Sequence, residues 1–142
     1  MAAAHGKDSY FSIEDSAGTT LRVITPYVKS VDFNRSNDAN DTTTKGAEGK
    51  TYRPGLTDGE IRLTGLWDDT ASVGSYTVLK TLLGVEITVG FEWGPEGNTA
   101  GMEKASGECV LTQYDESSPV DDMVAFTATL KISGDVTYGT FS

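Results

Sequence analysis

The residues from Asp121 to Gly139 constrain the fold more than any other part of the chain, because apolar and polar types alternate there with a period of two. One alternate set is apolar: Val124, Phe126, Ala128, Leu130 and Ile132. The residues between them are mostly polar: Ala125, Thr127, Thr129, Lys131 and Ser133. Successive side chains of a β-strand point to opposite faces, so the pattern predicts a strand with one core face and one wet face. We expect it to end in a tight turn near Gly134 and Asp135, where the last two strands meet.

Weaker alternation predicts further strands near residues 9–14, 21–24, 27–34, 60–67, 85–93 and 105–114. Only one segment, about residues 71–83, has helical spacing of apolar side chains, with Asp68 and Asp69 before it and Gly84 after it as cap signals. The sequence therefore predicts a mainly β fold, an antiparallel β-sandwich or barrel of about eight strands with one flanking helix. A length of 142 residues suits a single domain, residues 1–142.

A long polar segment, about residues 34–51, interrupts the strand pattern, with Ala39 and Ala47 as its only apolar members. So polar a segment has little to bury, and loops longer than about 12–15 residues are usually functional or disordered. We therefore expect a long polar loop that reaches outward.

The chain is acidic, with 21 Asp and Glu residues against 11 Lys and Arg residues and a formal net charge of −10. Tight binding to a phosphate backbone needs clustered cations, so this charge argues against a nucleic-acid-binding protein. Acidity that only keeps the surface soluble is the plainer interpretation. The single cysteine, Cys109, excludes an intrachain disulfide, and its apolar neighbours predict a buried thiol.

The sequence contains no common catalytic or metal-binding pattern. His5 is the only histidine and lies near the amino terminus, far from any nucleophile pattern. A calcium-loop start at Asp38 fails because Thr43 stands where the turn glycine belongs and Gly49 where the bidentate glutamate belongs. We therefore expect no catalytic residue, no metal and no cofactor, and Trp67 and Trp93 are in phase with the core faces of their strands.

The order of short motifs resembles the major tail tube proteins of long, non-contractile-tailed bacteriophages. The resemblance rests on Gly6-Lys-Asp-Ser-Tyr-Phe-Ser-Ile13, Thr25-Pro-Tyr-Val-Lys-Ser-Val-Asp-Phe33, Tyr52-Arg-Pro-Gly-Leu-Thr-Asp-Gly59 and Glu60-Ile-Arg-Leu-Thr-Gly-Leu-Trp-Asp68. It continues through residues 106–114, Ser118-Pro-Val-Asp-Asp122 and residues 126–139. These motifs span nearly the whole chain.

The resemblance implies a non-enzymatic β-sandwich subunit that forms hexameric rings, stacked into a hollow tube with an acidic lumen that conducts the genome. It implies the tape-measure, tail-terminator and tail-tip proteins as partners, passage of double-stranded DNA without tight binding, no membrane, and a place in the virion after synthesis in the host cytoplasm. The candidate lumen residues, on non-core strand faces, are Glu86, Glu92 and Glu108. The candidate contacts between subunits or rings, in the polar loop, are Asp38, Asp41, Lys45, Glu48 and Lys50.

Three other functions stay open at this stage, and the last of them is an enzyme that uses a pair of acidic residues, such as Asp68 and Asp69 or Asp121 and Asp122. A monomeric ligand- or carbohydrate-binding sandwich would use Trp67, Trp93 or Tyr114 as a stacking platform. A secretion-tube protein of a contractile injection system resembles tail tubes in fold. Size measurement separates a monomeric module from a self-assembling subunit.

Overall fold

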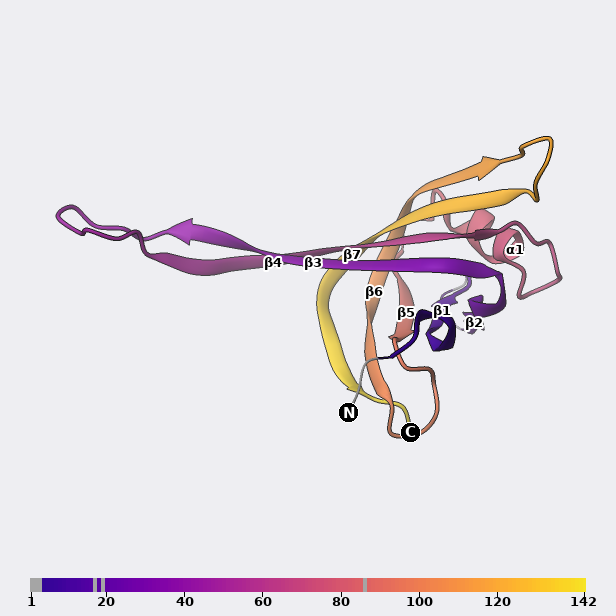
Figure 1. Cartoon of the computed structure of the whole chain (residues 1–142), viewed down its shortest axis with the longest axis horizontal. Coiled ribbons are helices and arrows are strands. Elements are labelled where there is room, and N and C mark those ends of the chain that lie inside the picture. Colours follow the sequence, from indigo (N-terminus) through magenta and orange to yellow (C-terminus); the bar gives the residue numbers. More distant parts are fainter. Residues whose placement is uncertain (1–3, 17, 19, 86) are drawn as a thin grey trace.

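The computed structural model describes residues 4–16, 18, 20–85 and 87–142, and it contains one seven-stranded sheet in which every pair is antiparallel (Figure 1). The strand order across the sheet is β2-β1-β5-β6-β7-β4-β3. The strands are β1 (Tyr10–Glu14), β2 (Leu21–Val23), β3 (Val28–Asp41), β4 (Tyr52–Leu66), β5 (Val89–Gly94), β6 (Glu103–Ser117) and β7 (Ala125–Thr140). The predicted mainly β, antiparallel fold is confirmed.

The expected tight turn near Gly134 and Asp135 is wrong, which is why the sheet has seven strands and not about eight. Strand β7 continues through this point with a bulge, since Ser133 pairs with Glu108 and Thr137 pairs with Ser106. Gly134 takes a φ of 84°, a left-handed conformation that suits glycine in a turn and in a bulge alike. The bulge bends β7, so that β6 and β7 run through both halves of a sheet that folds over its own core (Figure 1).

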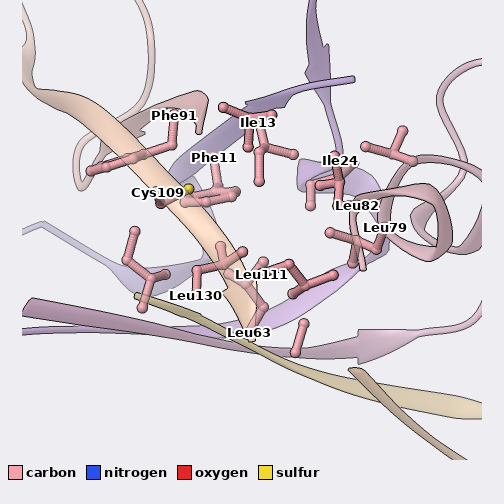
Figure 2. Close-up of a cluster of buried hydrophobic side chains, with 14 of the residues drawn as sticks. Phe11, Ile13, Ile24, Leu63, Leu79, Leu82, Phe91, Cys109, Leu111 and Leu130 are labelled. Carbon is pink, nitrogen blue, oxygen red and sulfur yellow. The ribbon is translucent and has the colours of Figure 1, made fainter. Parts of the chain in front are cut away.

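The core lies between the two halves of this folded sheet (Figure 2). Phe11, Ile13 and Phe91 come from β1 and β5, while Leu63 and Leu130 come from β4 and β7. The alternation in β7 is confirmed where it was clearest, because Phe126, Ala128 and Leu130 are buried. The two ends of the predicted apolar set are not fully buried. Ile132 is partly buried, and Val124 precedes the strand and is exposed.

The helical segment is shorter than the predicted 71–83. It consists of α1 (Ser75–Leu79) followed by a 3-10 turn, Lys80–Leu82. The first residues form a tight turn instead, in which Ser72 has a φ of 70° and the Asp68 carboxylate accepts a 2.8 Å hydrogen bond from the Thr70 amide. Hydrogen bonds from the side chain and the amide of Thr70 lower the pKa of Asp68 and use the carboxylate that was expected to cap the helix. Leu79 and Leu82 still close one side of the core, as the spacing predicted (Figure 2).

The predicted loop at 34–51 begins too early, because its first eight residues belong to a strand. Residues 34–41 extend β3 and pair with β4 up to Asp41 opposite Tyr52, which leaves residues 42–51 as the connection. Backbone hydrogen bonds hold a two-stranded ribbon without buried side chains, so the polarity that suggested a loop did not prevent strand pairing. The part of β3 and β4 that leaves the sheet body, residues 34–58, is called the arm below.

Cys109 is fully buried, as predicted, and lies in the core beside Phe11 and Phe91 (Figure 2). Burial raises the pKa of its thiol to about 12, with a smaller contribution from the charges of Glu108 and Glu14. The thiol is therefore protonated and unreactive at neutral pH.

Candidate assembly surfaces

The arm is a two-stranded ribbon that projects far from the body (Figure 1). Strand β4 pairs with β7 only from Glu60 onward, so beyond that point β3 and β4 have only each other in the part of the chain that the structure describes. Apart from Gly55, every side chain from 34 to 58 is exposed, including Leu56 at 81% and Tyr52 at 55%. An isolated two-stranded hairpin is at best marginally stable in water, so the arm is suited to packing against another molecule.

The five candidate contact residues of the sequence prediction all lie in the arm and are all exposed: Asp38, Asp41, Lys45, Glu48 and Lys50. The loop at the end of the arm is ordered by threonines. The Thr42 amide donates to the Thr51 carbonyl at 2.9 Å, and the Thr51 amide donates to the Thr43 hydroxyl at 2.8 Å. Asp41 accepts from the Thr43 amide at 2.8 Å, which lowers the pKa of that carboxyl.

The base of the arm is tied to the body by Arg35. Its guanidinium lies 4.6 Å from the centre of the Phe33 ring and 5.1 Å from that of Tyr138, and it donates to the Tyr138 hydroxyl. Phe33 in turn packs against Phe91 in the core, with 5.8 Å between ring centres. Ile132 of β7 packs closely against Gly59. A Cβ at position 59 would lie 2.7 Å from Cδ1 of Ile132, so a larger residue would force that side chain to move. Sequence reasoning missed this contact, since Arg35 and Tyr138 are 103 residues apart.

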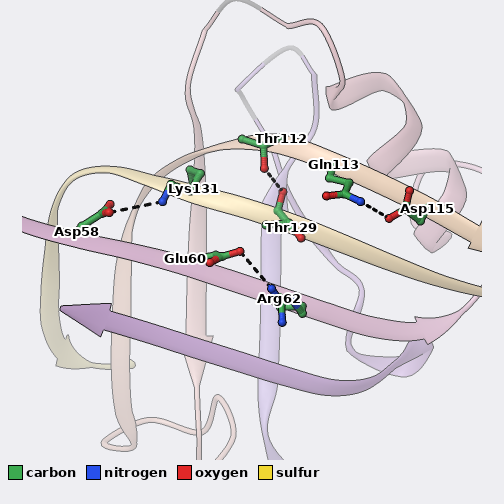
Figure 3. Close-up of polar contacts among 8 residues, drawn as sticks. All are labelled: Asp58, Glu60, Arg62, Thr112, Gln113, Asp115, Thr129 and Lys131. Carbon is green, nitrogen blue, oxygen red and sulfur yellow. Dashed lines mark hydrogen bonds and ion pairs between the residues drawn. The ribbon is translucent and has the colours of Figure 1, made fainter.

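A second surface is the non-core face of β3, β4, β7 and the second half of β6, called the polar wall (Figure 3). Its residues on the paired strands include Asp32, Glu60, Arg62, Thr129, Lys131, Gln113 and Asp115. Both basic side chains here are paired with carboxylates, Arg62 with Glu60 at 3.6 Å and Lys131 with Asp58 at 3.5 Å. A bulge at Thr112 lets Leu111 and Tyr114 both face inward while Gln113 and Asp115 stay on the wall.

The strands of the polar wall have unpaired edges. Among the described residues, β3 pairs only with β4, and β6 pairs with no strand but β7 beyond Cys109. Unpaired edges are templates for pairing with another chain. The wall is therefore a four-stranded sheet that has, within the described residues, an unpaired edge on each side.

The candidate lumen residues lie on a different part of the sheet. Glu92 and Glu108 share the non-core face of β5 and β6, where Glu92 pairs with Lys104 at 3.6 Å and Glu108 accepts from the Thr88 hydroxyl at 3.0 Å. Glu14 of β1 joins them, because its carboxylate accepts from the Gly90 amide. Glu86 lies outside the described residues.

The aromatic residues of the stacking-platform alternative are spread over separate places. Trp67 packs against Tyr76 with 4.9 Å between ring centres, and Tyr114 stacks on Phe126 at 6.0 Å. Burial and the neighbouring Glu116 raise the pKa of the Tyr114 hydroxyl. Trp93 lines another hollow, with Phe11 and Val31. Trp67 and Trp93 therefore do not form one surface.

Within the described residues there is no group of three or more His, Cys, Asp or Glu side chains placed to hold a metal ion. In the same part of the chain, no helix has the length and apolar character needed to cross a membrane.

Comparison with known proteins gives matches in structure but not in sequence. No protein-family model matches the chain, and a search of curated proteins finds no relative. A chain from the tail of an empty gene transfer agent particle, refined with C6 symmetry, superposes with a TM-score of 0.78 at 12% identity, covering 97% of this chain and all of the other. The SPP1 tail tube gives 0.75 at 11% identity over 98% of this chain and 81% of that one.

The tube of a contractile injection system is also similar. A chain of the PVC sheath-tube complex in its extended state gives a TM-score of 0.68 at 12% identity, covering 96% of this chain and 91% of the other. These matches define the fold of the chain as the one found in phage-like tails and injection tubes. The resemblance seen in the sequence motifs is thereby confirmed for the fold.

Proposed function

We propose that this chain is the structural subunit of a phage tail tube, in which copies form hexameric rings that stack into a hollow tube conducting the genome. The observation that carries the proposal is the arm, an exposed ribbon that buries nothing in its own subunit. The fold supports it, because the similar structures include a tail tube and a tail refined with C6 symmetry. Tape-measure, terminator and tail-tip proteins are the further partners that such a tube requires.

The polar wall is suited to line the tube. Its two unpaired edges allow six copies to join edge to edge into one closed barrel, because backbone pairing across copies satisfies the N–H and C=O groups that a single copy leaves open. The core then lies behind the wall, and α1 faces away from the barrel. The arm continues from the same strands, so it leaves the ring and reaches another subunit.

The charges of the wall are suited to passing DNA. A cation that is free to bind phosphate would hold the duplex at every ring, whereas the two basic residues of the wall are already paired with carboxylates. Asp32 and Asp115 add negative charge, and the other wall side chains include the neutral Thr129 and Gln113. Such a surface repels the phosphate backbone weakly and binds it poorly.

Assembly of the purified chain tests the proposal. We expect rings or long tubes in negative-stain micrographs, and a scattering signal that rises steeply when the protein is concentrated or seeded with preformed tubes. A sugar-binding module would stay monomeric under the same conditions. A chain that stays monomeric at every concentration, seeded or not, contradicts the tube function.

Charge reversal identifies the face that lines the lumen. The double substitution Glu60→Lys and Asp115→Lys changes each subunit by four charge units, two for each substitution, and turns the wall into a phosphate-binding surface. Tubes should still form, but DNA release from particles carrying this tube should slow several-fold at low salt and recover as salt is raised. Dye fluorescence of released DNA measures the rate.

The matched control is Glu92→Lys with Glu108→Lys, an equal charge change on the face that holds the candidate lumen residues of the sequence prediction. If this control slows release and the wall variant does not, the lumen is lined by β5 and β6, and the placement of the wall is wrong. Particles of each kind must first be shown to carry the variant tube.

A further inference from the structure

A groove with two lysines lies beside β1 and the start of β3. It has a volume of about 630 Å³, and the half-buried Val31 and Trp93 contribute apolar surface to it. Lys7 and Lys29 are the only ionisable side chains among the described residues that line it, and both are exposed. No described carboxylate forms an ion pair with either lysine. This basic groove is thus a positive site on a chain whose formal charge is −10.

The connection between β6 and β7 has the opposite character. Residues 118–124, called the acidic tip, project from the body on the side away from the arm (Figure 1). Val120 is fully exposed and Met123 is 66% exposed, so the tip presents apolar side chains to a partner. Asp121 and Asp122 lie between them and are exposed.

A hydrogen bond to the end of β4 holds the base of the acidic tip. The Trp67 amide donates to the Val124 carbonyl at 3.0 Å, which holds the last residue of the tip against the end of β4. Pro119 restricts the backbone in front of Val120, so less conformational freedom is lost when the tip is held by a partner. The tip is therefore a preorganised projection with an apolar end and two carboxylates.

We propose that the acidic tip of one copy docks in the basic groove of a second copy, with Val120 against the apolar surface of Trp93 and Val31, and with Asp121 and Asp122 beside Lys7 and Lys29. This contact rests on the proposed self-assembly and names one of its interfaces. Two different surfaces of the same chain meet, so the contact is heterologous and repeats into a closed ring or a stack.

Charge distinguishes the acidic tip from the other projection of the chain. The arm carries four basic and four acidic residues and is neutral overall, so the groove lysines do not attract it as a whole. Two carboxylates beside an exposed valine match a groove with two lysines and an apolar lining, and complementary charges of this kind select partners and fix their register.

A charge-swap series tests the pairing in the full chain. Reversing the tip with Asp121→Lys and Asp122→Lys, or the groove with Lys7→Glu and Lys29→Glu, should raise the concentration needed for assembly at least ~10-fold, because like charges then meet. The quadruple variant should recover assembly to within about 3-fold of the original chain. Circular dichroism and thermal midpoints should not change, since all four side chains are exposed.

The control for bulk charge in the tip reversal is Asp69→Lys with Glu103→Lys, two exposed positions outside the acidic tip and the basic groove with the same gain of four charge units. It should assemble like the original chain. Double variants that assemble normally, or a quadruple variant that stays as impaired as the doubles, overturn the proposed contact.

A disulfide test separates the contact from the tube itself. Cys109 is buried and does not react, so Val120→Cys in one protein and Lys29→Cys in another introduce the reactive thiols. Mild oxidation of the mixture should give the mixed dimer, whereas Val120→Cys mixed with Asp69→Cys should not. If the mixed dimer forms but no tubes are seen, the tip–groove contact is supported and the tube function is contradicted. If tubes form but no mixed dimer is found, the tube function is supported and the contact is overturned.

Discussion

Excision of the arm should abolish tube formation and leave the body folded. The deletion removes residues 37–57 and joins Ser36 to Asp58 through Asn-Gly, because these two residues are paired across the ribbon and this dipeptide suits a two-residue hairpin turn. The deleted segment contains no buried side chain, so the core loses nothing. Arg35 remains and still contacts Phe33 and Tyr138.

Sedimentation velocity and negative-stain microscopy measure the result, with the original chain under identical conditions as the reference. We expect a monomer, or at most single rings, and a thermal midpoint within a few degrees of the original. The excised segment carries three basic and three acidic residues, so a change in net charge cannot explain a loss of assembly. Tubes of normal length from the excised chain would show that the arm is not an assembly element.

Leu130→Ala in β7 should strongly destabilise the body of the subunit. The side chain is fully buried and pairs across the sheet with Ile61 on β4 and Leu111 on β6. Removing it leaves a cavity at the centre of the core, with an expected loss of roughly 2–5 kcal/mol in the free energy of unfolding. Urea unfolding of the monomeric, arm-excised chain gives the value free of any contribution from assembly.

The matched control is the neighbouring residue, Thr129, on the opposite face of the same strand. Its carbonyl accepts from the Thr112 hydroxyl at 3.1 Å, a bond that Thr129→Ala keeps. This substitution should change stability by no more than about 0.5 kcal/mol. A larger loss for Thr129→Ala than for Leu130→Ala would mean that β7 is shifted by one residue in its pairing.

The most predictable part of the fold was the buried centre of each strand. The alternation around Phe126 and Leu130 identified the core face correctly, and the apolar neighbours of Cys109 predicted its burial. These signals are local, because a strand with one wet face must alternate with a period of two whatever its partners are. The ordered motifs likewise identified the fold that the structural matches confirm.

The arm and the bulge were missed for physical reasons. In the arm, pairing is carried by backbone groups, which are the same for every residue type except proline, so polar side chains at 34–41 gave no strand signal. At Gly134 a glycine with positive φ is equally suited to a turn and to a bulge. The structure has a bulge and not a turn because the partner strand β6 extends from Glu108 back to Glu103 and pairs with β7 on both sides of Gly134.

The sequence by itself determined a single-cysteine, acidic, antiparallel β chain without a catalytic pattern, because charge, composition and strand periodicity are properties of neighbouring residues. Tertiary structure alone decided which surfaces exist. Arg35 meets Tyr138, and Lys7, Lys29 and Trp93 border one groove, only after β7 bends and the two halves of the sheet close over the core. Contacts between residues so far apart depend on strand order and register, which the periodicity of one strand does not contain.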